Sequence, residues 1–192
     1  MPVSALAEHP FDLPDEAATQ ALAARFAHAF VVWQSSDARR QGLQVQLNGD
    51  LGAGKTAFVR AVLRALGHTG RVRSPTYTLV EPYQIAPADT SVSGTSGSDV
   101  TPVTSVLLVH HFDLYRFSDA AEWHEAGFDE YLASQAINLI EWPSRARAAL
   151  GVPDLLLDID ILGDGRTLTA RAFTPAGLLC LSEVSKQNPP SC

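Results

Sequence analysis

A glycine-rich segment at residues 49–56 has the residue types and the spacing that bind nucleotide phosphates. It fits the pattern G-x-x-x-x-G-K-[ST] at every fixed position, with the residues Gly49, Asp50, Leu51, Gly52, Ala53, Gly54, Lys55 and Thr56. The glycines allow successive backbone N–H groups to turn toward an anion. The Lys55 ammonium can reach the outer phosphates of a nucleotide, and the Thr56 hydroxyl can ligate Mg²⁺. The segment therefore predicts a phosphate-binding loop, called the P-loop below.

The residues on either side of the P-loop predict the elements that such a loop requires. Residues 43–47 alternate apolar and polar side chains as a short strand does. Residues 57–66 have apolar side chains at helical spacing, and Gly67 follows where a helix C-terminus favours glycine. Phosphates would then lie at the helix N-terminus, where unpaired N–H groups and the helix dipole attract anions.

Two later apolar runs each end in a carboxylate. Residues 106–113 end in Asp113 and have the form of a Walker B strand, and residues 137–141 end in Glu141. A carboxylate just past a buried parallel strand emerges at the edge of the sheet where ligands bind. Either acid, together with Thr56, can hold Mg²⁺ directly or through water, and the other can orient the attacking water. The residues alone leave this assignment open.

Other polar residues near these runs have two interpretations each. Thr76 follows a Ser-Pro turn and is placed to sense the terminal phosphate, whereas Thr78 fits a strand packing position equally well. His110, His111 and Asp113 are residue types that can together ligate a metal ion. However, adjacent residues of a strand point to opposite faces, which disfavours an ion shared by the two histidines.

The nucleotide base is predicted from an absent motif. Guanine-specific P-loop proteins typically carry a late N-K-x-D segment, and this chain has none, so adenine is favoured. Trp142, directly after Glu141, either packs to fix the loop or covers the nucleotide.

The whole chain predicts one α/β domain. Its 192 residues are 46% hydrophobic, which is normal for a single globular core. We expect a P-loop NTPase fold with a mostly parallel central sheet flanked by helices and closed by a C-terminal β-hairpin. The predicted parts are an N-terminal tail (1–11), the ATPase domain (12–175) with a flexible insertion loop (87–104), and a C-terminal extension (176–192) with a disordered end. Within the domain we expect an opening helix at 14–32, a strand at 76–83 and hairpin strands at 155–162 and 168–173.

Charge and composition exclude some classes of partner. The 21 acidic and 14 basic residues give a net charge of −7, which disfavours strong direct binding of nucleic acid. The sequence has no apolar run long enough to span a membrane, and its first eight residues lack a signal-peptide pattern, so we expect a cytoplasmic protein. The two cysteines, Cys180 and Cys192, are too isolated to suggest a metal site.

Four motifs in order carry a family resemblance. They are the P-loop, Ser-Pro-Thr-Tyr-Thr-Leu-Val-Glu at 74–81, His-Phe-Asp-Leu-Tyr-Arg at 111–116 and Leu-Ile-Glu-Trp at 139–142. Over residues 12–173 the sequence resembles the TsaE (YjeE) family of bacterial tRNA threonylcarbamoyladenosine biosynthesis ATPases. The insertion at 87–104 departs from the family pattern, in which a shorter hairpin stands; a solvated insertion and a partner-contacting loop are both open.

The resemblance implies a small Mg²⁺-dependent ATPase needed to form threonylcarbamoyladenosine at position 37 of tRNAs that read codons beginning with adenine. It implies action on a complex of the TsaD and TsaB proteins, with tRNA contacted only indirectly. By motif, the phosphate ligand would be Lys55, the Mg²⁺ ligands Thr56 and Glu141 with help from Asp113, the switch threonine Thr76, and the residues lining the nucleotide Trp142, Pro14, Asp15, Glu16 and Arg166.

Two alternative functions remain from the residues themselves. A small-molecule kinase would use the same P-loop but usually needs an arginine-rich lid, and residues 87–104 contain no arginine. A nucleotide-dependent interaction module would use Asp113 and Glu141 only to hold Mg²⁺.

Overall fold

A seven-stranded mixed sheet forms the centre of the computed structural model, which describes residues 3–37, 42–75, 77–86, 106–118 and 120–186. In the order β1-β7-β6-β2-β5-β4-β3, the four middle strands β6, β2, β5 and β4 are parallel, and antiparallel strands lie at both sides. The strands are β1 (Ala7–Leu13), β2 (Leu43–Asn48), β3 (Val80–Ile85), β4 (Leu107–Asp113), β5 (Ile137–Glu141), β6 (Leu155–Leu162) and β7 (Gly165–Ala172).

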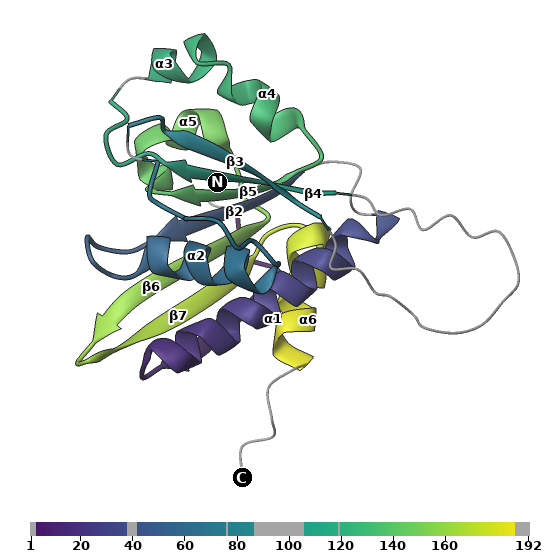
Figure 1. Cartoon of the computed structure of the whole chain (residues 1–192), viewed down its shortest axis with the longest axis vertical. Helices are drawn as coiled ribbons and strands as arrows, with labels where there is room; N and C mark the ends of the chain where they lie inside the picture. Colours follow the sequence, from purple (N-terminus) through teal and green to yellow (C-terminus); the bar gives the residue numbers. More distant parts are fainter. Residues whose placement is uncertain (1–2, 38–41, 76, 87–105, 119, 187–192) are drawn as a thin grey trace, which may run out of the picture.

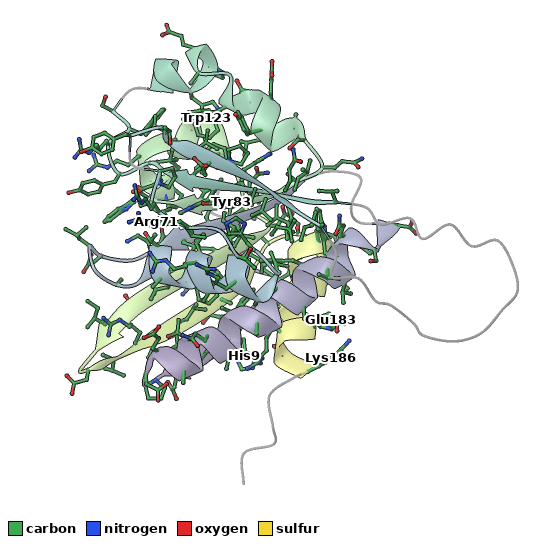
Figure 2. The ribbon with its side chains drawn as sticks, viewed as in Figure 1. His9, Arg71, Tyr83, Trp123, Glu183 and Lys186 are labelled. Atoms are coloured by element: carbon green, nitrogen blue, oxygen red, sulfur yellow. The ribbon has the colours of Figure 1, made fainter. Side chains whose placement is uncertain are left out.

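Helices cover both faces of the sheet and enclose two cores (Figure 1). The larger core lies under α1 (Glu16–Gln34), α2 (Lys55–Ala65) and α6 (Pro175–Lys186). The smaller one lies under α3 (Ala120–Glu125), α4 (Phe128–Ala133), the 3-10 helix η2 (Pro143–Ala146) and α5 (Arg147–Leu150). Trp123, labelled in Figure 2, stacks on Phe112 of β4 with ring centroids 5.9 Å apart. Because strand side chains alternate between faces, β4 and β5 contribute to both cores.

The predicted fold class is confirmed, and so is the C-terminal hairpin, formed by β6 and β7. The sheet contains as many antiparallel as parallel pairings, because β1 and β3 add antiparallel edges. The N-terminal tail predicted at 1–11 is wrong for residues 7–11, which belong to β1. The strand predicted from residue 76 begins only at Val80, and Thr78 lies exposed in a turn. Thr76 and the predicted insertion at 87–104 lie outside the described residues.

Two elements that sequence patterns did not indicate form by contact with distant parts of the chain. β1 pairs with β7 along its whole length, from Ala7 opposite Ala172 to Leu13 opposite Arg166. α6 occupies most of the predicted C-terminal extension and buries Cys180, Leu181 and Val184. α6 lies beside α1 in Figure 1. Among the described residues, no helix has the length and apolar character needed to cross a membrane.

His110 of β4 gives the fold a predicted dependence on pH. Burial lowers the pKa of His110, against the opposing effect of its 2.9 Å hydrogen bond to Asn138. Below the ordinary histidine pKa of about 6.5, the unfolded chain therefore takes up a proton that the folded chain does not. Stability should fall as the pH drops below this value, by up to about 1.4 kcal/mol per pH unit.

The variant His110→Asn tests this expectation, because its amide nitrogen can replace Nδ1 as the donor to Asn138. Thermal unfolding at pH 7.5 and 5.5 should show a smaller drop in Tm for His110→Asn than for the wild-type protein. His28→Asn, at an exposed position of α1, should keep the wild-type drop. Equal drops in all three proteins would contradict the role of His110.

Candidate active site

The P-loop connects β2 to α2 through three backbone positions that only glycine adopts readily. Gly49, Gly52 and Gly54 have φ values of 140°, 83° and 110°. A Cβ atom on Gly49 would lie 2.4 Å from the carbonyl oxygen of Ile159 in β6. Gly54 precedes the first turn of α2, and no side chain caps that turn. The N–H groups of this helix end are therefore available to an anion.

The Lys55 ammonium is held at the centre of the loop. Its Nζ donates hydrogen bonds to the carbonyl oxygens of Gly49 at 2.6 Å and Asp50 at 2.9 Å. It also lies 3.7 Å from the centroid of the Trp142 ring, a cation–π contact. Burial lowers the pKa of Lys55, whereas Glu141, Asp113 and Asp50 raise it. The carbonyl oxygens of the loop thus accept hydrogen bonds from the Lys55 ammonium, which a bound phosphate would otherwise accept.

Asp113 and Glu141 end neighbouring parallel strands and lie directly opposite each other in register. The Thr56 hydroxyl donates to Glu141 Oε2 at 2.9 Å. Asp113 accepts a hydrogen bond from the Ser74 hydroxyl and another at 3.1 Å from the backbone N–H of Tyr115. Both carboxylates are buried. Two strand ends and the P-loop helix therefore bring the predicted acids to one place.

A cavity of about 310 Å³ lies over these groups. Its lining includes Lys55, Thr56, Asp113, Glu141 and Trp142. Trp142 adopts a left-handed backbone conformation with φ 59°, which turns the chain directly after Glu141. A hydroxyl and two carboxylates are hard oxygen donors, which suit Mg²⁺. Across the described residues, no group of three or more His, Cys, Asp and Glu side chains could hold a metal ion. A Mg²⁺ ion bound by one or two carboxylates, water and phosphates needs no such group.

A larger cavity of about 980 Å³ also adjoins the P-loop, with Gly52, Ala53 and Gly54 in its lining. Glu16 from α1 and Arg166 from β7 both line it, and Arg166 Nε lies 3.3 Å from the carbonyl oxygen of Ala53. Asp15 also lines it, and its carboxylate caps α1 by accepting from Ala18 N at 2.7 Å. The two cavities share three lining residues, Gly52, Gly54 and Ala57. A nucleotide bound at the P-loop can therefore extend from one cavity into the other.

The structure brings together most of the residues predicted for the site. Lys55, Thr56, Asp113, Glu141 and Trp142 line the smaller cavity, together with Leu51, Gly52 and Gly54, and Ala53, Glu16 and Arg166 line the larger one. Gly49, Asp50 and Pro14 line neither cavity, although the carbonyls of Gly49 and Asp50 hold Lys55.

Sequence reasoning missed two polar partners of the carboxylates. Ser74 bonds to Asp113, and His111 Nε2 lies 2.7 Å from Glu141 Oε1. His110 points to the other face and bonds to Asn138, as the alternation of strand side chains predicts. The same alternation places His111 on the face of Asp113, and this signal could have identified it as a neighbour of the site.

Comparisons with known proteins agree over most of the chain. A family model described as "Threonylcarbamoyl adenosine biosynthesis protein TsaE" matches residues 13–172. A tRNA threonylcarbamoyladenosine biosynthesis protein TsaE from Haemophilus influenzae is 35% identical over 173 residues, which are 90% of this chain and 95% of that protein. The protein of the same name from Bacillus subtilis is 32% identical, over 78% of this chain and 82% of its own. The crystal structure of YdiB from Bacillus subtilis superposes with a TM-score of 0.68 and 26% identity, covering 95% of this chain and 97% of that one.

Proposed function

Because this chain belongs to the TsaE family of threonylcarbamoyl adenosine biosynthesis proteins, we propose that it is a Mg²⁺-dependent ATPase that serves tRNA modification. Its output would be N6-threonylcarbamoyladenosine at position 37 of tRNAs reading codons that begin with adenine. It would act in the cytoplasm on the TsaD–TsaB complex and contact tRNA only indirectly. The observation that carries the ATPase proposal is the cavity in which Lys55, Thr56, Asp113 and Glu141 meet at the N-terminus of α2.

The proposed mechanism relies on positioning and charge rather than on covalent chemistry. Lys55 exchanges the carbonyls of Gly49 and Asp50 for the outer phosphates. Glu141 and Thr56, whose side chains are hydrogen-bonded to each other, would hold Mg²⁺, and the ion would supply neutralisation of the phosphate charge. Asp113 would assist in holding the metal and would orient water. Thr76 is proposed as the switch residue that senses the terminal phosphate, and Trp142 covers the site beside Lys55.

Hydrolysis assays with and without the partners test this function. The release of phosphate from ATP is measured with the protein alone and after addition of TsaD and TsaB. Stimulation by the two partners is the expected result. Tight ATP binding without hydrolysis in either condition would instead favour an interaction module. Fast turnover that ignores the partners, or transfer of phosphate to a metabolite, would contradict the proposal.

Replacing Glu141 should separate the metal site from the phosphate site. Glu141→Gln keeps the shape of the side chain but removes the charge next to Thr56. We expect hydrolysis at saturating MgATP to fall by at least about 100-fold, because the charge stabilisation supplied through a bound metal amounts to several kcal/mol. Glu130→Gln, an exposed position of α4, should leave hydrolysis unchanged. Normal hydrolysis and normal Mg²⁺ dependence in Glu141→Gln would contradict the assignment of Glu141 as a metal ligand and would favour Asp113 in that role.

The larger cavity is proposed to hold the adenine base. The Glu16 carboxylate, which accepts from Gln20 Nε2 at 3.0 Å, can also accept from the exocyclic amine of adenine. Guanine presents a carbonyl oxygen at the corresponding position, which a carboxylate repels. Arg166 would close this cavity against the P-loop.

Glu16→Ala should therefore weaken ATP binding about 10-fold, the value of one hydrogen bond to a charged group, and should tighten GTP binding, because it removes the repulsion of the guanine carbonyl oxygen. Titrations of both nucleotides measure this change in preference. Gln20→Ala removes the neighbouring amide but keeps the carboxylate, so it should retain the preference for ATP. An equal loss of both nucleotides in Glu16→Ala would show that Glu16 does not read the base.

A further inference from the structure

His111 lies in the wall behind the proposed metal site. It belongs to β4, two residues before Asp113, and faces Leu139 of β5 in register. Its ring extends diagonally to the next residue on the same face of β5, where Nε2 lies 2.7 Å from Glu141 Oε1. The side chain is fully buried. This contact therefore lies behind the cavity rather than in its lining.

The two oxygens of Glu141 have different partners. His111 contacts Oε1, and the Thr56 hydroxyl donates to Oε2. A carboxylate oxygen accepts hydrogen bonds, so in this contact the imidazole is the donor, through Nε2. The other ring nitrogen, Nδ1, is buried and has no hydrogen-bond partner among the described residues. The polar contact of this ring is thus directed at Glu141 alone.

The terminal torsion of a glutamate side chain is soft, so an unrestrained carboxylate turns easily. A donor behind one oxygen removes this freedom. We propose that His111 is a positioning residue, which holds Oε1 of Glu141 so that Oε2 and the Thr56 hydroxyl are directed at the Mg²⁺ ion that accompanies ATP. The inference rests on the proposed Mg²⁺-dependent ATP binding and adds to it a residue that touches neither metal nor nucleotide. Partners of this kind typically change metal affinity 10- to 100-fold.

Two conservative variants test this role. In His111→Gln, the amide nitrogen reaches about as far as Nε2 and can donate to Glu141, whereas the shorter side chain of His111→Asn cannot reach it. His110→Asn is the matched control, because it changes the adjacent buried histidine, which bonds to Asn138 instead. Calorimetric titration measures ATP binding in EDTA and over a range of Mg²⁺ concentrations, and thermal melting shows that each variant is folded.

We expect His111→Asn to need about 10- to 100-fold more Mg²⁺ for half-maximal tightening of ATP binding, with affinity in EDTA unchanged within about twofold. His111→Gln should return the Mg²⁺ requirement to within about fivefold of the wild-type value, and His110→Asn should not change it. A wild-type Mg²⁺ requirement in folded His111→Asn would overturn the role of His111 and leave the proposed ATPase function standing. A shift in His111→Gln as large as that in His111→Asn would have the same meaning. If ATP binding by the wild-type protein does not respond to Mg²⁺, the metal assignment fails as well. If His111→Asn does not fold, a shifted requirement in folded His111→Gln overturns the inference, and an unshifted one supports it.

Discussion

Lys55→Met is expected to reduce ATP affinity by about 100-fold or more. The ammonium donates two hydrogen bonds to carbonyls of the P-loop, and in the nucleotide complex these donors would pass to phosphate oxygens. Each hydrogen bond to a charged group contributes about 1.5–3 kcal/mol, so losing two corresponds to a factor of about 100 or more in affinity. Methionine keeps most of the side-chain length and can still pack against Trp142. Calorimetric titration with MgATP measures the loss.

The chain offers a matched control, because it contains only one other lysine, Lys186. Lys186 lies at the end of α6, where its ammonium pairs with Glu183 on the surface (Figure 2). Lys186→Met removes the same charge from the protein and should bind ATP like the wild type. A loss in Lys186→Met equal to that in Lys55→Met would mean that net charge, and not the P-loop contact, determines affinity.

Gly49→Ala should produce the second large effect, this time on folding. The new Cβ would meet the backbone oxygen of Ile159 at 2.4 Å, and the φ of 140° is unfavourable for alanine. Overpacking costs about 1–3 kcal/mol and the strained backbone about 1–3 kcal/mol more, so we expect a loss of about 2–6 kcal/mol in the free energy of unfolding. That is a large part of the total stability of a typical domain. Urea unfolding without nucleotide measures it.

Gly163→Ala separates the cost of the steric contact from the cost of the unfavourable φ. Gly163 also has a positive φ, of 58°, but a Cβ there would have no neighbour within 4 Å. The cost should be only about 1–2 kcal/mol, the penalty of the left-handed conformation alone. Similar losses in Gly49→Ala and Gly163→Ala would show that β6 moves away from the P-loop at little cost.

The sequence was sufficient for the parts of the site that follow local rules. The P-loop pattern predicts a strand, a turn and a helix in fixed order, and β2 and α2 occupy these places. The apolar runs ending at Asp113 and Glu141 predict strand ends, and parallel pairing brings these two residues side by side. Each inference needed only residues close together in the chain and the rule that parallel strands end at one edge of the sheet.

The remainder depended on contacts that no local pattern contains. β1 has a proline in its middle, and it is a strand because β7 supplies its hydrogen bonds. The bond between His111 and Glu141 depends on the register between β4 and β5, which no local pattern specifies. The contact of Lys55 with Gly49 and Asp50 likewise depends on the three-dimensional path of the loop.

The pairing of β1 with β7 also has a consequence for the order in which this protein can form on the ribosome. The P-loop is made early, but Glu141, the partner of Thr56, follows 85 residues later in the chain. β1 can form its ladder of hydrogen bonds only later, after β7 near the end of the chain has been synthesised. Contacts between such distant segments slow folding, because a long loop must close before the contact contributes. A nascent chain stalled before β5 would therefore hold a complete P-loop sequence without Glu141, the proposed metal ligand that accepts from Thr56.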